Sequence, residues 1–263
     1  MARSEDRQSE VLEEGDIFFP YRPTVEEDEP SGLDDVQRFY VVLRPQSGGS
    51  KGGDPQGGKL RLLVMGRKRL PDVERHERAW GFVETVASAA GAIEKELRET
   101  DYETKTRGKR RLPAARPAGE GVYAVTLEGG QMHLSYSLEL PEQPREVQQA
   151  FKIAPEASYA LSIKNPEAGQ PRAAGLGREA KADYPQELQE EFRGRRFARE
   201  NVRLLDYEGA EFILVGAHRD PEKAYGVALE TEKEDEAHAD IINRLRLAKS
   251  RHPIAPLFEG RWA

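Results

Sequence analysis

The chain of 263 residues contains no cysteine. This absence excludes disulfide bonds, thiolate nucleophiles, and zinc or iron–sulfur sites with cysteine ligands. Long hydrophobic runs are also missing, since no stretch approaches the roughly 20 apolar residues that a helix needs to cross a bilayer. The first residues, MARSEDRQSEVLEEGD, lack the apolar core of a secretory signal. We therefore expect a soluble cytoplasmic protein that does not interact with membranes.

Positive charge is in deficit over the whole chain. There are 47 acidic and 40 basic residues, which give a net charge of -7 and a pI near 5.5. Such a balance argues against a protein that coats nucleic acid or anionic lipid through its overall field. Any binding of a polyanion must therefore be local.

Motifs for catalysis, cofactors or metals are lacking as well. No Gly-x-Ser-x-Gly elbow or phosphate-binding P-loop occurs, and AGLG at 174–177 is an incomplete dinucleotide fingerprint. Glu234, Asp235 and His238 can share a helical face, but exposed helices carry such residues routinely, so we expect no metal site. Catalytic residues and cofactors stay unknown, and no motif indicates a family.

Two pairs of strands are predicted by apolar runs that flank glycines. Residues 38–45 and 59–65 are expected to pair as a hairpin across a loop with six glycines between Gly48 and Gly58. Residues 121–140 carry the strongest hairpin pattern, because two adjacent glycines can supply the positive backbone angles of a tight turn. If Glu128 faces Gln131 in that hairpin, one face is continuously apolar.

A long helix is predicted over residues 72–98. Its apolar positions recur at steps of three and four residues, at Trp80, Val83, Ala87, Ala90 and Leu97. Further helices are expected over 183–199 and 232–248, and a short one near PREVQQAFKI.

These elements predict an α+β fold with antiparallel β-sheets, three or four packed helices and mixed topology. We expect a disordered N-terminus over 1–14 and an N-terminal β-rich sub-domain over 15–102 that contains the helix 72–98. A basic linker over 103–120 then leads to a C-terminal α+β sub-domain over 121–263.

The stretch LLVMGRKRLPD at 62–72 has a partial echo at 212–222. Glycine, arginine and proline match without gaps, but the similarity does not extend beyond the stretch on either side. We interpret it as a recurring way of ending strands with a basic residue close to proline, and not as a duplication.

Basic residues gather in clusters that could hold an anion through guanidinium forks. The predicted anion-binding residues come from two of these clusters: Arg67, Lys68 and Arg69, then Lys105, Arg107, Lys109, Arg110 and Arg111. A third cluster interleaves arginines with aromatic rings that could stack on bases: Phe192, Arg193, Arg195, Arg196 and Phe197. The alternative is that these cations form solvated surfaces neutralised by carboxylates of the same chain.

The favoured hypothesis is a non-enzymatic binding or accessory protein. Its basic loops at 66–69 and 105–111 would hold an anionic partner such as nucleic acid, a nucleotide or an acidic protein. One alternative is a metal-assisted or carboxylate-based hydrolase whose site gathers histidines and carboxylates distant in sequence. Another is a structural or self-assembling subunit, and the oligomeric state stays open. The binding hypothesis requires the cations to converge and to lack internal counter-ions.

Overall fold

The computed structural model describes residues 9–46, 58–106, 108–168, 181–229, 231, 239–245, 247 and 252–263. Its strands are β1 (Glu10–Pro23), β2 (Val36–Pro45), β3 (Leu60–Met65), β4 (Arg78–Ala87), β5 (Thr100–Thr104), β6 (Gly108–Leu112), β7 (Arg116–Glu128), β8 (Gln131–Leu140), β9 (Glu156–Lys164), β10 (Phe197–Ala198) and β11 (Glu211–Gly216). Its helices are short: η1 (Leu33–Asp35), α1 (Ala90–Leu97), α2 (Glu146–Phe151), α3 (Gln186–Glu190), η2 (Val202–Asp206), α4 (Pro221–Tyr225), α5 (Asp240–Arg244) and α6 (Ala255–Phe258).

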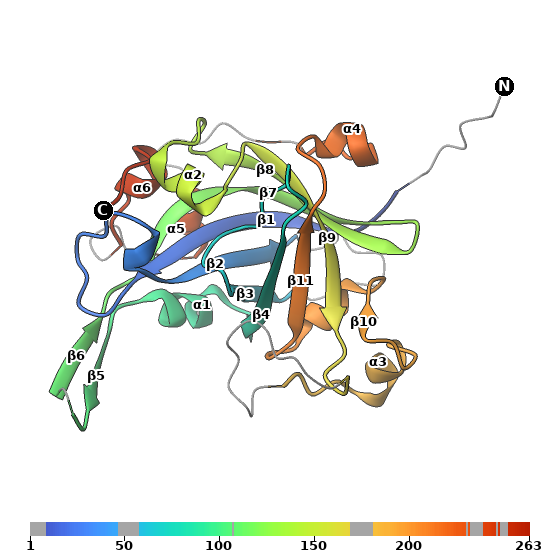
Figure 1. The fold of residues 1–263 in the computed structure, drawn as a ribbon, viewed down its shortest axis with the longest axis horizontal. Helices are drawn as coiled ribbons and strands as arrows, with labels where there is room; N and C mark the ends of the chain where they lie inside the picture. Colours follow the sequence, from blue (N-terminus) through green and yellow to red (C-terminus); the bar gives the residue numbers. More distant parts are fainter. Residues whose placement is uncertain are drawn as a thin grey trace.

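Eight strands form a closed antiparallel barrel (Figure 1). The strand order is β9-β11-β4-β3-β2-β1-β7-β8, and the pairing of β8 with β9 closes the ring. β10 adds to β9 outside the ring, while β5 and β6 form a separate two-stranded sheet. The predicted α+β fold with three or four packed helices is therefore wrong, because long-range strand pairing and not helix packing organises the core.

The predicted helix over 72–98 is wrong as well. Arg78–Ala87 is strand β4, paired with β3 and β11, and only Ala90–Leu97 is helical. A strand packed on both faces also places apolar residues three and four positions apart, which explains the misleading stripe. Glycine at position 81 of β4 lets β11 pack closely against it, since a Cβ on Gly81 would lie 2.3 Å from the Phe212 ring.

The two predicted hairpins are confirmed. β2 pairs with β3, and in the β7–β8 hairpin Glu128 faces Gln131 as expected. Gly129 and Gly130 have φ values of 56° and 78°, which a side chain would disfavour at this turn. The glycine-rich residues 47–57 that join β2 to β3 lie outside the described residues.

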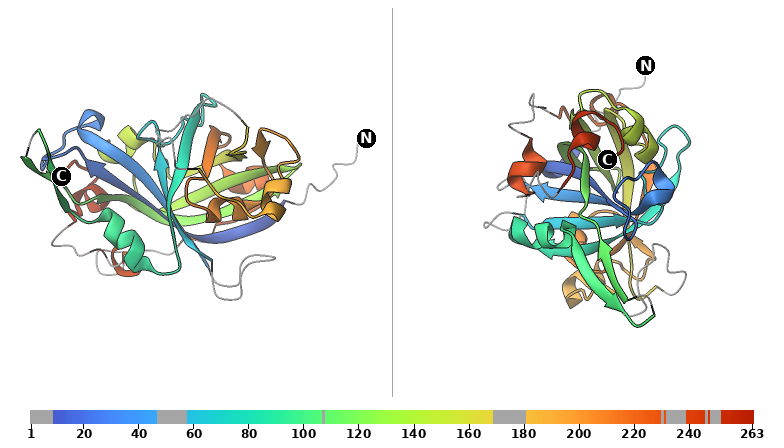
Figure 2. Two further views of the ribbon diagram at one scale, coloured as in Figure 1. Left: turned by 90° about the horizontal axis from the view of Figure 1, so that it is seen from below. Right: turned by 90° about the vertical axis from the view of Figure 1, so that its left-hand side faces the viewer.

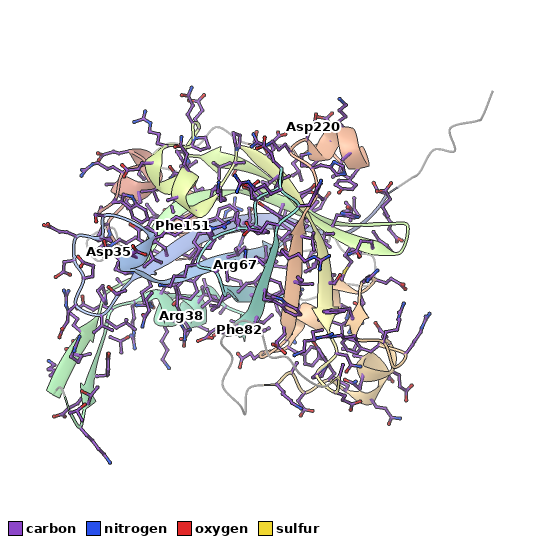
Figure 3. All side chains as sticks on the ribbon, in the orientation of Figure 1. Asp35, Arg38, Arg67, Phe82, Phe151 and Asp220 are labelled. Atoms are coloured by element: carbon purple, nitrogen blue, oxygen red, sulfur yellow. The ribbon has the colours of Figure 1, made fainter. Side chains whose placement is uncertain are left out.

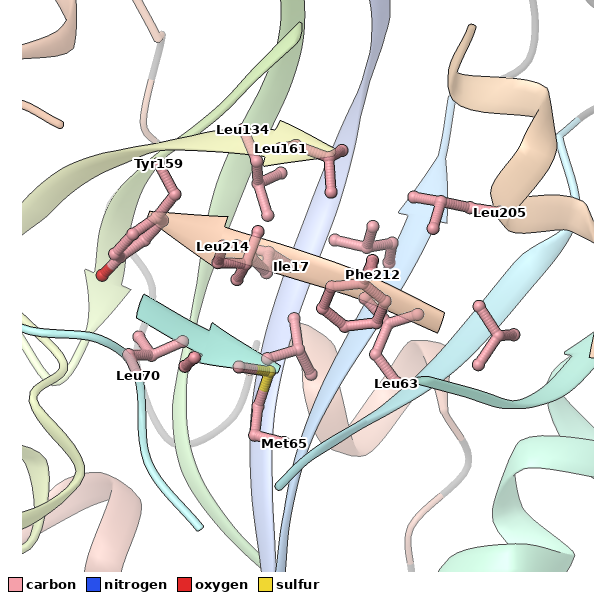
Figure 4. Packing of buried hydrophobic residues seen from close by; sticks show 14 of the residues in the cluster. Ile17, Leu63, Met65, Leu70, Leu134, Tyr159, Leu161, Leu205, Phe212 and Leu214 are labelled. Carbon is pink, nitrogen blue, oxygen red and sulfur yellow. The ribbon is translucent and has the colours of Figure 1, made fainter. Parts of the chain in front are cut away.

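The barrel interior is a packed apolar core (Figure 4). All eight strands contribute inward side chains, which include Ile17, Phe39, Leu63, Val83, Val125, Leu134, Leu161 and Phe212. The outer face of β1 to β4 is covered in turn by apolar residues of the short helices, which include Ile93, Leu97, Ile241 and Leu257. Burial on both faces explains the consecutive apolar residues at 17–19 of β1, 39–43 of β2 and 62–65 of β3.

The two ends of the barrel differ in chemistry. At one end, the rings of Phe39 and Phe151 stack with centroids 4.7 Å apart, and Tyr21 packs on Trp262 at 5.5 Å. At the other end, η2 supplies Asp206 to an ion network in which the buried Arg61 also pairs with Glu13. Glu13 of the ion network and Tyr21 of the aromatic cluster lie toward opposite ends of β1, so the two groups close opposite ends of the barrel.

The predicted linker range 103–120 contains the end of β5, the whole of β6 and the beginning of β7. β5 and β6 project from the barrel as a hairpin, which all three views of Figures 1 and 2 show. Strands from both sides of this range share the barrel, since β1 pairs with β7. Of the predicted helix 232–248, residues 240–244 form α5, while 232–238 lie outside the described residues. Within the described segments, every helix is too short or too polar to cross a membrane.

Candidate functional site

The first basic cluster lies in the turn after β3, where one carboxylate and one backbone carbonyl hold its three cations. Arg67 and Arg69 both pair with Glu77, and the Arg69–Glu77 contacts measure 2.7 and 2.9 Å. Lys68 donates from its ammonium group to the backbone carbonyl of Val36. The hydrogen bond from Arg69 lowers the pKa of Glu77 to about 2, so this counter-ion stays charged at neutral pH.

The second cluster lies on the β5–β6 hairpin, away from the first. Arg67 lies near the centre of the view in Figure 3, whereas the hairpin is at the lower left, so the fold does not bring the two clusters together. On the hairpin, Lys109 pairs with Asp101 at 2.9 Å. Lys105 has no ion pair with any described residue. Arg107 is outside the described residues.

Arg110 and Arg111 sit at the base of the hairpin and pair with carboxylates of other segments. Arg110 contacts Glu26 at 2.9 Å, and Arg111 contacts Glu99 at 2.9 Å as well as Asp28. These three carboxylate side chains remain 50%, 51% and 62% exposed, respectively. Both arginines are therefore neutralised, but by partners that water can reach.

Arg116, at the start of β7, is a third cation in this region that the sequence interpretation missed. It is only 3% exposed, and its Nη2 donates to the carbonyl of Asp28 at 2.8 Å. Its Nε and Nη1 have no hydrogen-bond partner among the described residues. Burial lowers the pKa of this guanidinium. The only signal in the sequence is one arginine inside the apolar stretch LPAARPAG.

Arg110, Arg111 and Arg116 all contact one segment, and we call them the arginine site. The segment is residues 24–29, with the sequence TVEEDE, and we call it the acidic loop. Among the described residues, no other segment makes a hydrogen bond or ion pair with all three of these arginines. The arginine site is therefore the place where the basic cluster 105–111 meets its internal counter-ions.

The base of the hairpin is held rigidly by another buried arginine. Arg22, 3% exposed, donates to the carbonyl groups of Glu96, Arg98 and Pro113. Glu96 and Arg98 precede the hairpin in the chain and Pro113 follows it. A single guanidinium therefore attaches both ends of the hairpin to β1. The arginine site is consequently presented on a fixed support.

The third basic cluster lies between α3 and β10 and provides no stacking surface for bases. Phe192 is fully buried in the core. Phe197 packs against Trp80 with ring centroids 5.9 Å apart, and Arg196 lies 5.7 Å from the Phe197 ring. Both aromatic rings therefore pack against residues of the same chain.

Two histidines distant in sequence meet on the outside of the barrel. The Tyr225 hydroxyl lies 2.8 Å from Nδ1 of His133, and the His218 ring packs against the same tyrosine at 5.8 Å. This cluster attaches α4 to β8. No group of three or more potential metal ligands occurs among the described residues, and Glu234, Asp235 and His238 lie outside them.

The histidine cluster predicts a pH dependence of stability. Burial lowers the pKa of His133, although Glu128 opposes the shift, so the unfolded chain binds this proton more readily than the folded protein. The free energy of unfolding is expected to fall as the pH decreases below about 6.5. Urea unfolding across this range, with His133→Gln as the comparison, measures the effect. An identical pH dependence in the variant would contradict the assignment.

A cavity of about 470 Å³ opens near the polar end of the barrel. Its lining includes three carboxylates and two amines: Asp183, Asp206, Glu208, Lys59 and Lys181. It gathers carboxylates, as the hydrolase alternative expects, but no histidine lines it. Comparison of the chain with protein-family models, curated proteins and solved structures found no match.

Proposed function

We propose that this protein is a cytoplasmic binding protein that holds an acidic segment of a partner protein at the base of the β5–β6 hairpin. The observation that carries the proposal is the seating of the acidic loop on the arginine site, where carboxylates and a backbone carbonyl occupy three guanidinium groups. These internal contacts support a surface that accepts carboxylates.

The internal ion pairs are weak enough to be exchanged. Glu26, Asp28 and Glu99 are each at least half exposed. Exposed pairs contribute about 0–1 kcal/mol each, because water and salt screen them. The ion pairs of Arg67 and Arg69 are less accessible than those of the hairpin, since their shared partner Glu77 is only 17% exposed. A competing anion therefore has better access to the hairpin than to the turn after β3.

A polypeptide partner suits this surface better than nucleic acid. Acidic side chains lie between the cations, as Asp101 and Glu103 of β5 face Arg111 and Lys109 of β6. These carboxylates and the net charge of -7 repel any polyanion, but an acidic peptide can also pair with the backbone of β6, which nucleic acid cannot do. Tyr102 is 40% exposed on the same hairpin, and exposed tyrosines frequently anchor protein interfaces.

Binding of a fluorescein-labelled polyglutamate peptide, followed by anisotropy at low salt, tests the proposal. The double variant Arg110→Gln/Arg111→Gln is expected to weaken binding at least about tenfold, because it removes two of the three guanidinium forks of the arginine site. The control Arg67→Gln/Arg219→Gln changes the charge equally at exposed sites elsewhere and is expected to stay within about twofold. Equal losses in both variants, or tighter binding of single-stranded DNA than of the peptide, would overturn it.

A further inference from the structure

The acidic loop contacts the hairpin as a bound peptide would. Its Glu26 N–H donates to the Arg111 carbonyl at 2.9 Å, which is a backbone contact of the kind made between neighbouring strands. The Glu26 side chain pairs with Arg110, and Asp28 pairs with Arg111. Backbone and side-chain contacts are therefore combined along β6, as when an extended peptide adds to the edge of a sheet.

Most of this edge of β6 is left unused by the loop. β5 and β6 form a sheet of their own, so β6 has one edge without a strand beside it. The bond from Glu26 is the only backbone hydrogen bond made to β6 from outside the hairpin by the described residues. Because alternate residues direct their backbone groups to the same edge, Lys109 presents its N–H and C=O beside those of Arg111. A longer extended segment could pair with both.

Arg116 is also incompletely satisfied while the loop is in place. The loop offers it one carbonyl, that of Asp28, and leaves two of its nitrogens without a partner in the described structure. A buried guanidinium without acceptors is unfavourable, since it has lost water and gained little in return. A carboxylate beside Arg116 would correct this deficit.

We propose that the acidic loop is an internal ligand whose place the partner's acidic segment takes. This inference rests on the function proposed above. The incoming segment pairs in extended form along β6 and supplies Arg116 with the carboxylate that the loop does not provide. The loop thereby lowers the apparent affinity of the arginine site, because only the fraction of molecules with a displaced loop can bind.

Neutralising the loop tests the inference directly. Glu26→Gln/Asp28→Asn is expected to raise the affinity for the polyglutamate peptide about tenfold, since the competitor loses its charge. The control Glu142→Gln/Glu187→Gln removes two exposed carboxylates elsewhere and is expected to change affinity by less than about twofold. In the wild-type protein, saturating peptide is also expected to abolish the hydrogen-exchange protection of the Glu26 amide and to shift the Nε–H signal of Arg116.

The outcomes separate this inference from the proposed function. If the wild-type protein binds the peptide through Arg110 and Arg111, but neutralising the loop leaves affinity and Glu26 protection unchanged, the loop is not a competitor and only the inference fails. If only the Glu26→Gln/Asp28→Asn variant binds, the loop blocks the site and the inference is supported. Binding by neither protein would overturn both proposals.

Discussion

Replacing Arg61 by methionine is expected to lower the free energy of unfolding by about 3–5 kcal/mol. Arg61 is 2% exposed inside the barrel and donates to Glu13 at 2.6 and 2.9 Å and to Asp206 at 2.7 Å. Glu13 accepts a further hydrogen bond from the Tyr123 hydroxyl at 2.7 Å. Methionine would leave two carboxylates without their cation, and Glu13 is the more deeply buried of them, with 6% of its side chain exposed.

Urea unfolding of Arg61→Met measures this loss. The matched control is Arg219→Met, because Arg219 pairs with Glu74 while both side chains are about two-thirds exposed, at 64% and 66%. That variant is expected to change stability by less than about 0.5 kcal/mol. A loss below about 1 kcal/mol for Arg61→Met would show that the network is well hydrated and contributes little.

Replacing Phe212 by alanine is expected to cost about 3–5 kcal/mol. Phe212 of β11 is fully buried in the barrel core, where removal of its ring leaves a cavity that neighbouring strands cannot close. Thermal or urea unfolding measures the cost. A loss below about 1 kcal/mol would mean that the core around β11 is not packed as described.

A substitution at Gly81 tests the contact between β4 and Phe212 independently. Its Cβ would meet the Phe212 ring at 2.3 Å and the Val64 carbonyl oxygen at 2.8 Å, so Gly81→Ala is expected to destabilise by about 1–3 kcal/mol. The cost of Gly81→Ala should be smaller when Phe212 is already alanine, because the first clash is gone. Additive losses would show that the two residues are not in contact.

Local elements were predictable where one short stretch contains the whole pattern. The β7–β8 register follows from two adjacent glycines and the apolar alternation on either side, and both partners lie within 20 residues of each other. The same applies to the β2–β3 pair and to the short helix α2. In the β7–β8 hairpin, the turn chemistry and the side-chain period agree with each other.

The candidate site could be anticipated only in part. The exposed cations of the hairpin are visible in the sequence as a basic cluster, but their counter-ions are far away, as Glu26 and Asp28 lie more than 80 residues before Arg111. Arg116 gives no local signal because its importance comes from burial and from missing acceptors. Neither burial nor the absence of an acceptor can be derived from residue spacing.

The sequence by itself determined the absence of thiol chemistry, the tight turns at glycines and the apolar runs that become strands. Tertiary structure alone decided that β8 meets β9 to close a barrel, that residues 78–87 form a strand, and which carboxylate neutralises each cation. The physical reason is that backbone pairing, burial and ion pairing depend on distances between segments far apart along the chain. Periodicity records only which side chains share a face of one segment.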